Sequence, residues 1–348
     1  MVIAMDIKSV LFALAGEDCI TGGDEGAAHT ALALVKESCP EAHYDALGNI
    51  VAPFVPPSPG GEHILLEAHL DEIGFMVTSV DADGFLRVGK SGGPDLRILL
   101  GHEVRVHGQK TLPGVFCCRP PHLASKDEYK KVPEPSELAV DIGLTHDEAC
   151  ALVAPGDCVF LSRTPAKLLG GLVTGKAFDN RAGVTAVLRC LELLRSRRPD
   201  VGVTALFSLS EELGFKNAGA GAFAAAPTQA LVFDVSFALT PDSPREKCGE
   251  FFKGPMIGVS PILSNEVTAA LFETAKAKGI PYQTEVMPGG TGTNSDAVAV
   301  AGPGVKTGLL SIPLRYMHTA AEVIAPEDIE STGRLAAEYI LDAAARIR

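Results

Sequence analysis

The sequence predicts an α/β fold in which a mostly parallel central sheet is flanked by helices and interrupted by a small β-barrel-like insertion. Apolar runs of strand length alternate with helical stretches over 1–72 and 166–348, which is typical of a sheet covered on both faces. Between about 76 and 165, helical periodicity nearly disappears and short alternating runs such as MVTSV and EVRVHG take its place. With 348 residues the chain is long enough for two domains, so we expect a discontinuous main domain (1–72 and 166–348) and an inserted β-rich domain (73–165).

The N-terminal part of the main domain is predicted to contain two helices, over 6–16 and 26–38, and a hairpin over 43–55. The buried strand that follows ends at His69-Leu70-Asp71. Since His69 and Asp71 are two residues apart, extended chain would place both on one side. Metal-binding imidazoles usually have an orienting carboxylate nearby, although a simple polar pair is the commoner explanation of one such pair alone.

Three further strands run into acids or a histidine. The strand VTALFSLS is followed by Glu211-Glu212, QALVFDV (229–235) ends at Asp234, and the run from Val305 ends at His318. Asp179 precedes a helix expected over 182–195, where it would either cap the first turn or belong to a site. Helices are also expected over 218–226, 264–279 and 325–347.

These polar residues are predicted to meet, because ligands bind beyond the carboxyl ends of the strands in open α/β sheets. Two imidazoles and several carboxylates suit zinc, cobalt or manganese, and they are numerous enough for two ions that share one carboxylate. Adjacent side chains such as Glu211 and Glu212 diverge, so one can bind a metal while the other transfers protons. Metal-assisted hydrolysis is therefore the predicted chemistry.

Composition excludes several other classes of function. Acids outnumber bases by 43 to 30, and the net charge of −13 argues against nucleic acid or an anionic membrane as a partner. The 8 cysteines show no CxxC spacing and are expected to be reduced. The amphipathic N-terminus favours a first helix over a signal peptide, and no apolar run approaches the ~18 residues of a membrane span. A soluble cytoplasmic protein is expected. Walker and GxSxG motifs are both absent from the sequence.

Six motifs, in family order over nearly the whole chain, resemble the M42 family of di-metal aminopeptidases. They are HLDEIGF (69–75), GKAFDNRAG (175–183), SEELGFKNA (210–218), FDVSFA (233–238), GTGTNSDA (290–297) and PLRYMHT (313–319). Family members include tetrahedral aminopeptidases, glutamyl aminopeptidases and proteins once called endoglucanases. The resemblance implies an enzyme that removes N-terminal residues from short peptides.

By this resemblance, five residues would hold two divalent metal ions. His69 and Asp234 would bind one ion, Glu212 and His318 would bind the other, and Asp179 would bridge them. The mixed nitrogen and oxygen donors make zinc or cobalt the expected metals, with manganese as a third candidate.

The resemblance also assigns two roles beside the metals. Glu211 would be the general base, and Asp71 would orient His69. Residues 73–165 would form a PDZ-like dimerisation domain, and the chain would assemble as a homo-oligomer built from dimers, commonly a dodecamer in this family. One departure is Asn294, which stands where many relatives have an aspartate and which we expect to bear on the substrate pocket.

Three other interpretations stay open at the level of sequence. A related di-zinc carboxypeptidase or deacylase would act on peptides with blocked N-termini. A glycosidase needs carboxylates roughly 5–9.5 Å apart across a glycosidic bond, which neighbouring glutamates beside two histidines fit poorly. A scaffold without turnover would keep the fold alone. The sequence does not specify the preferred N-terminal residue or the physiological metal.

Overall fold

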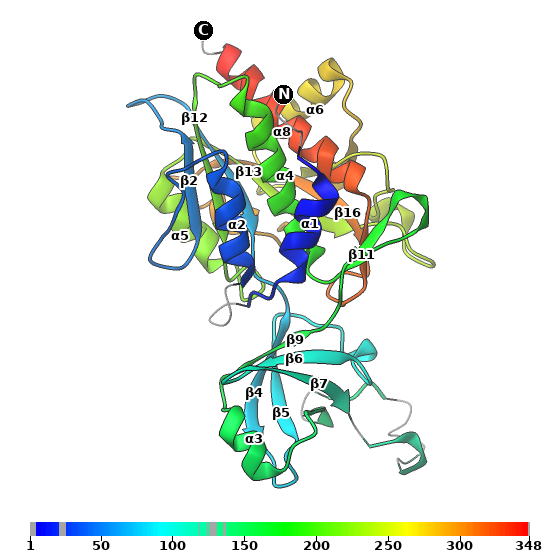
Figure 1. The fold of residues 1–348 in the computed structure, drawn as a ribbon. Helices are drawn as coiled ribbons and strands as arrows, with labels where there is room; N and C mark the ends of the chain where they lie inside the picture. The colour runs from blue at the N-terminus through cyan, green and yellow to red at the C-terminus, as the bar shows by residue number, and fades with distance from the viewer. Residues whose placement is uncertain are drawn as a thin grey trace.

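The computed structural model describes residues 5–20, 26–117, 119–123, 125, 131–134 and 137–346. Figure 1 shows a body of helices packed on a twisted sheet, with a smaller barrel beneath it. The chain leaves the sheet after β3 (His63–His69), builds the barrel, and returns through β10 (Ala166–Lys167) and β11 (Val173–Gly175).

The sheet is parallel at its centre, and most of its marginal pairs are antiparallel, although the outer strands β14 and β15 pair in parallel. Its order is β1-β2-β12-β3-β13-β16-β17-β11-β10, and β14 pairs with both β16 and β15. The four central strands β12 (Gly202–Ser208), β3, β13 (Gln229–Phe237) and β16 (Lys306–Arg315) run parallel. The flanking strands are β1 (His43–Tyr44), β2 (Ile50–Val55), β14 (Met256–Val259), β15 (Gln283–Val286) and β17 (Glu322–Ile324).

The prediction of a mostly parallel sheet is therefore wrong for the margins. Strand pairs β1–β2, β10–β11 and β16–β17 are antiparallel, because each is joined by a short connection rather than by a crossover helix. The expected hairpin over 43–55 is one of them. The central strands, which carry the polar residues, follow the prediction.

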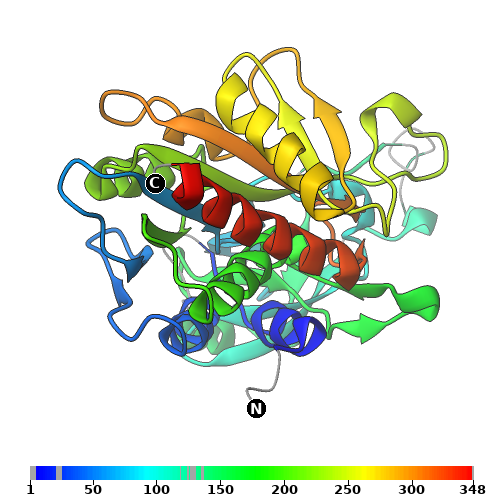
Figure 2. The same cartoon turned by 90° about the horizontal axis from the view of Figure 1, so that it is seen from above.

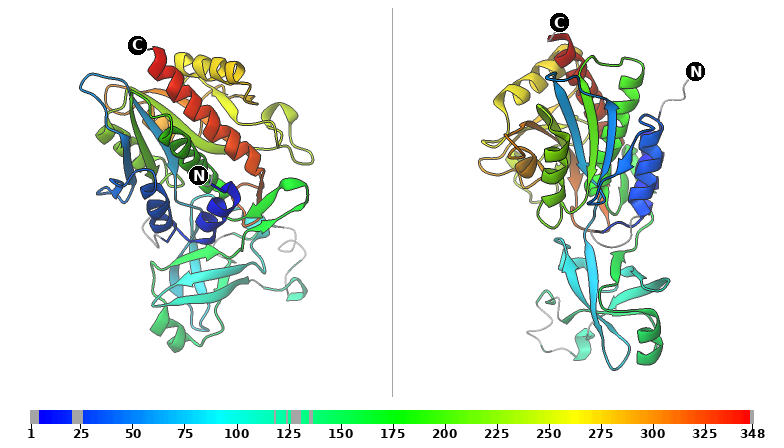
Figure 3. Two further views of the ribbon diagram at one scale, coloured as in Figure 1. Left: turned by 45° about the horizontal axis from the view of Figure 1, so that its top comes forward. Right: turned by 90° about the vertical axis from the view of Figure 1, so that its left-hand side faces the viewer.

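Helices cover both faces of this sheet (Figures 2 and 3). Alternate residues of β3 show the division: Ile64 and Leu66 pack into one core cluster, whereas Leu65 packs into another. The larger cluster includes α1 (Ile7–Gly16), α2 (Gly26–Lys36), α4 (Phe178–Arg195), α6 (Asn265–Lys278) and α8 (Pro326–Arg346). The smaller includes α5 (Lys216–Ala225) and α7 (Ser295–Val298). Short 3₁₀ turns are η1 (Leu96–Ile98), η2 (Pro121–Leu123), η5 (Leu169–Gly171) and η6 (Arg245–Lys247).

The β-rich insertion forms a closed barrel with its own core. Its strand order is β4-β5-β8-β7-β6-β9, from β4 (Gly74–Val80), β5 (Leu86–Ser91), β8 (Ala139–Asp141), β7 (Thr111–Cys117), β6 (Glu103–His107) and β9 (Cys158–Leu161). Phe75 and Phe116 pack edge to face inside it, and α3 (His146–Leu152) begins with a capping box at Thr145. A barrel is thus present, while its description as a PDZ-like dimerisation domain stays a prediction.

A buried ion network joins the barrel to the main body. Asp18, which follows α1, accepts hydrogen bonds from Arg105 and His107 of β6 at 2.8 and 3.0 Å. Lys176 lies 2.9 Å from Asp18 and 2.7 Å from Glu72. Burial alone would raise the pKa of Asp18, but its hydrogen bonds with these three basic side chains hold that pKa well below the usual value.

No helix in the described ranges combines the length and the hydropathy that crossing a bilayer requires.

We predict that Asp18→Asn lowers the free energy of unfolding by about 3 kcal/mol at neutral pH, because it leaves buried cations without their partner. Since the folded-state pKa of Asp18 lies below the unfolded value of about 3.9, this stabilisation is complete above that value and is lost as the pH falls below it. Urea unfolding at several pH values should show the deficit shrinking below about pH 4.

Glu266→Gln is the matched control for this prediction, since it removes one charge from an exposed pair with Lys306 and should cost less than about 1 kcal/mol. A deficit of that small size for Asp18→Asn, or one independent of pH, would contradict the role assigned to the network.

Candidate active site

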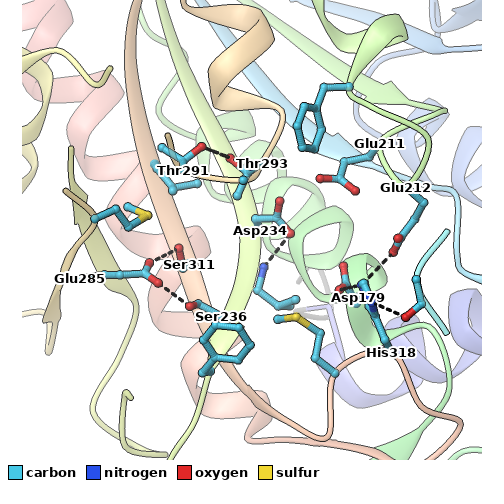
Figure 4. A pocket seen from close by; sticks show the side chains of 18 of the residues that line it. Asp179, Glu211, Glu212, Asp234, Ser236, Glu285, Thr291, Thr293, Ser311 and His318 are labelled. Carbon is cyan, nitrogen blue, oxygen red and sulfur yellow. Dashed lines mark hydrogen bonds and ion pairs between the residues drawn. The ribbon is translucent and has the colours of Figure 1, made fainter. Parts of the chain in front are cut away.

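A cavity of about 420 Å³ opens at the carboxyl end of the parallel strands. Figure 4 shows Asp179, Glu211, Glu212, Asp234 and His318 pointing toward one another in it. Each of these residues comes from a different part of the chain, apart from the adjacent pair Glu211 and Glu212. His69 lies behind them, buried at the end of β3. The predicted convergence is therefore what the structure shows.

One donor group consists of His69, Asp179 and Asp234, whose ligand atoms lie within 4.8 Å of one another. The Nε2 atom of His69 is 3.2 Å from Asp179 Oδ1 and 3.8 Å from Asp234 Oδ1. Asp234 lies inside β13, which continues to Phe237, rather than at the end of a strand as predicted. The bonding to β16 continues past Asp234, so the apolar run underestimates the length of the strand.

A second donor group consists of Asp179, Glu212 and His318, again within 4.8 Å. The Nε2 atom of His318 is 3.4 Å from Glu212 Oε1 and 3.6 Å from Asp179 Oδ2. Asp179 therefore belongs to both groups, with one oxygen toward each histidine. This sharing matches the arrangement of two cations that have one carboxylate in common.

The two imidazoles are oriented by backbone carbonyls. The Nδ1 atom of His69 is 3.0 Å from the carbonyl of Asp71, and that of His318 is 2.9 Å from the carbonyl of Gly93. Because a carbonyl only accepts, each Nδ1 carries a proton, and each Nε2 faces the carboxylates. A Cβ at position 93 would lie 3.0 Å from His318 Nδ1, which explains a glycine on this turn.

Asp71 holds the backbone of Glu211 and Glu212 in place. Its two carboxylate oxygens accept the backbone N–H groups of Glu211 and Glu212, each at 3.2 Å. Burial would raise the pKa of Asp71, but the hydrogen bond with His69 and these N–H groups lower it. Asp71 thus holds the Glu211–Glu212 turn in place as an ionised carboxylate, besides lying 3.5 Å from His69 Nδ1.

The crowding of acids raises the affinity of the site for protons. Burial, together with repulsion from Asp179 and Glu212, raises the pKa of Glu211 to about 8. Burial and nearby acids likewise raise the pKa of Asp234 well above its usual value. Burial would lower the pKa of His318, but Glu212 and Asp179 raise it to about 10. Four acids thus crowd around two imidazoles, and bound cations in place of protons would offset the excess of negative charge.

The helix-capping explanation of Asp179 is wrong. Asp179 and Asn180 have non-helical backbone angles, so the regular part of α4 begins after them. Asn180 caps this regular part, because its Oδ1 accepts the N–H of Gly183 at 3.0 Å. The Nδ2 of Asn180 donates to the carbonyl of Phe233 at 2.8 Å, which fixes the start of the helix beside β13. With its neighbour acting as the cap, the carboxylate of Asp179 is left to face the histidines.

Sequence reasoning missed Glu322, the first residue of β17. Its buried carboxylate accepts the backbone N–H of Asp179 and that of His318, each at 3.1 Å. Glu322 thereby ties together two residues of the second donor group. The sequence offered no signal for it, because an acid in the segment AAEVIAP matches no motif.

The loop that contains Asn294 shapes the pocket as expected, although Asn294 itself is not among the lining residues. It is buried, and its Nδ2 donates to Glu67 at 2.8 Å and to Ser208 at 3.0 Å. The neighbouring residues Thr291 and Thr293 are the ones that form the wall. Thr291 and Thr293 therefore shape the pocket, whereas Asn294 anchors their loop to Glu67 and Ser208.

Comparison with known proteins agrees with this geometry. The model of the M42 glutamyl aminopeptidase family matches residues 48–335. A lysyl aminopeptidase from Pyrococcus furiosus is 31% identical over 308 residues, with 87% of each chain covered. An aminopeptidase from the archaeon Desulfurococcus kamchatkensis is 32% identical with a TM-score of 0.90, covering 97% of this chain and 94% of that one.

The TET1 peptidase of Pyrococcus horikoshii is 29% identical with a TM-score of 0.85, covering 97% of this chain and 100% of its own. The family model spans most of the chain, and the relatives align along nearly their full length. The chain therefore belongs to the M42 family of aminopeptidases and is a peptidase hydrolase.

Proposed function

We propose that this chain is a metal-dependent aminopeptidase that releases N-terminal residues from short peptides. The observation that carries the proposal is the sharing of Asp179 between two donor groups, each with its own histidine. Members of the family are aminopeptidases, and a cavity of about 420 Å³ has the size of a small ligand site.

In this proposal His69 and Asp234 hold one divalent cation, Glu212 and His318 hold the other, and Asp179 bridges them. The mixed nitrogen and oxygen donors suit zinc or cobalt, and manganese also fits. Support comes from the two Nε2 atoms that face the carboxylates, and from the excess of acids around them. Such cations would supply Lewis-acid polarisation of the scissile carbonyl.

Glu211 is the general base of the proposed reaction. It lines the cavity but belongs to neither donor group, so its carboxylate is free to exchange protons. It would take a proton from the attacking water and deliver it to the leaving amine. Asp71 is a positioning residue, which orients His69 and holds the backbone of Glu211.

We further propose that the chain works as a homo-oligomer. The TET1 peptidase of Pyrococcus horikoshii assembles into a tetrahedron or an octahedral shell, and its fold matches 97% of this chain. In that assembly, residues 73–165 would serve as the dimerisation domain and residues 1–72 and 166–348 as the catalytic domain. We also propose a cytoplasmic location, which rests on the absence of CxxC spacing among the 8 cysteines of the sequence.

We predict that a strong chelator abolishes hydrolysis of aminoacyl amides and that added zinc, cobalt or manganese restores it. Peptides with a free N-terminus should be cleaved, whereas the same peptides with an acetylated N-terminus should not. Peptide cleavage that survives complete removal of metal would contradict metal dependence. Cleavage of the acetylated peptides would favour a deacylase or carboxypeptidase instead.

Glu211→Gln should lower kcat by about 10²- to 10⁴-fold while two metal ions per chain are retained, because it removes the base and leaves the donor groups intact. The neighbouring change Glu212→Gln is the matched control and should reduce the metal content itself. Steady-state kinetics and elemental analysis separate the two effects. An unchanged kcat in Glu211→Gln would show that another group is the base.

A further inference from the structure

We propose that Glu285 makes the cavity a receptor for a positively charged side chain, so that the enzyme prefers peptides that begin with lysine or arginine. The inference rests on the proposed aminopeptidase activity, which it deepens by naming the substrate class. The names of relatives do not decide the question, since glutamyl and lysyl aminopeptidases both occur among them.

Glu285 projects into the cavity from β15, at the margin of the sheet. Along β15, half-buried and exposed residues alternate, and Glu285 is one of those that face inward. It lines the same cavity as Asp234 (Figure 4). A carboxylate thus lies in the substrate cavity outside both candidate metal groups.

Two serines fix the position of this carboxylate. Ser311 of β16 donates to Glu285 Oε2 at 2.7 Å, and Ser236 of β13 donates to Oε1. Ser236 follows Asp234 by two residues, so it lies about 6.5 Å farther along the same face of the strand. Glu285 is therefore held by Ser311, which pairs with the proposed metal ligand Asp234, and by Ser236, one pleat repeat farther along, where we expect the side chain of an N-terminal residue to extend.

The hydrogen bonds leave Glu285 able to bind a cation. Each carboxylate oxygen can accept about two hydrogen bonds, and each receives one from a serine. Donors aimed at both oxygens hold the carboxylate in one orientation. An ammonium or guanidinium group entering the cavity would find a fixed, negatively charged acceptor.

The rest of the cavity suits the remainder of a lysine side chain. Met287, Leu309 and Met317 supply apolar surface for its methylene stem. Among the described residues that line the cavity, none is a lysine or an arginine. Glu285 thus has no lysine or arginine beside it in the wall, and an acidic N-terminal side chain would meet the like charge of Glu285.

A purely structural role for Glu285 explains less. The backbone of β15 is already paired with β14 from Met256–Gln283 to Val259–Val286, so the strand does not need this carboxylate to hold it in the sheet. A second alternative is that Glu285 binds the α-ammonium group, which every substrate shares. That alternative predicts equal losses for all substrates and is therefore separable.

The test compares lysine with norleucine, which has the same unbranched stem without the charge. The wild-type enzyme should hydrolyse lysyl amide at least about tenfold better than norleucyl amide, as judged by kcat/KM, and glutamyl amide least well. In Glu285→Gln the ratio of lysyl to norleucyl kcat/KM should fall to about 1. Glu266→Gln, which removes one exposed acid far from the cavity, should keep the wild-type ratio.

Binding of L-lysine and L-norleucine, measured by calorimetry, tests the pocket without turnover. Tighter binding of lysine that depends on Glu285 supports the inference even if no amide is cleaved, in which case only the proposed function fails. Hydrolysis with equal lysyl and norleucyl rates in the wild type would overturn the inference and leave the proposed function standing. Equal losses for both substrates in Glu285→Gln would also overturn it, because they would identify an α-ammonium anchor.

Discussion

Repulsion among carboxylates at the end of the parallel strands is the constraint on which the rest of this site depends. Asp179, Glu211, Glu212 and Asp234 face one another around two imidazoles, and burial raises the cost of their negative charges. The scaffold holds them together by rigid means. Parallel pairing of β3 with β13 fixes the segments that carry His69 and Asp234. The backbone N–H groups of Glu211 and Glu212 donate hydrogen bonds to Asp71, which fixes that turn. A site that concentrates charge in this way is matched to cations, which would relieve the repulsion and displace the protons.

Much of this was accessible from the sequence, because apolar runs locate the central strands and parallel strands deliver their ends to one edge. His69 and His318 illustrate that success. The features that could not be predicted depend on contacts between segments that are distant in the sequence. Nothing in the local sequence shows that Glu322 accepts two backbone N–H groups, or that Glu285 reaches two serines on neighbouring strands. The antiparallel margins could not be predicted either, because the apolar pattern alone does not give strand direction. A short connection sets it for β1–β2, whereas β2–β12 and β11–β17 join segments far apart in the sequence.

The barrel and the sheet are linked at the place where the chemistry is proposed to occur. Gly93, on the segment that follows β5, orients His318 through its carbonyl. Glu72, the residue after Asp71, forms an ion pair with Lys176. Through Asp18, the same network reaches Arg105 of the barrel. Displacement of the barrel would therefore move the carbonyl of Gly93 that orients His318, a proposed metal ligand. This coupling gives a physical reason why the insertion leaves the main body between His69 and Asp179, within the site, rather than at a distant loop.

An anomalous difference map from crystals of the zinc-loaded protein would show directly whether the two donor groups hold two ions. We expect two peaks, one in contact with His69 and Asp234 and the other with Glu212 and His318, with Asp179 touching both. No peak at these residues after zinc loading, or peaks only at other places on the chain, would contradict this expectation.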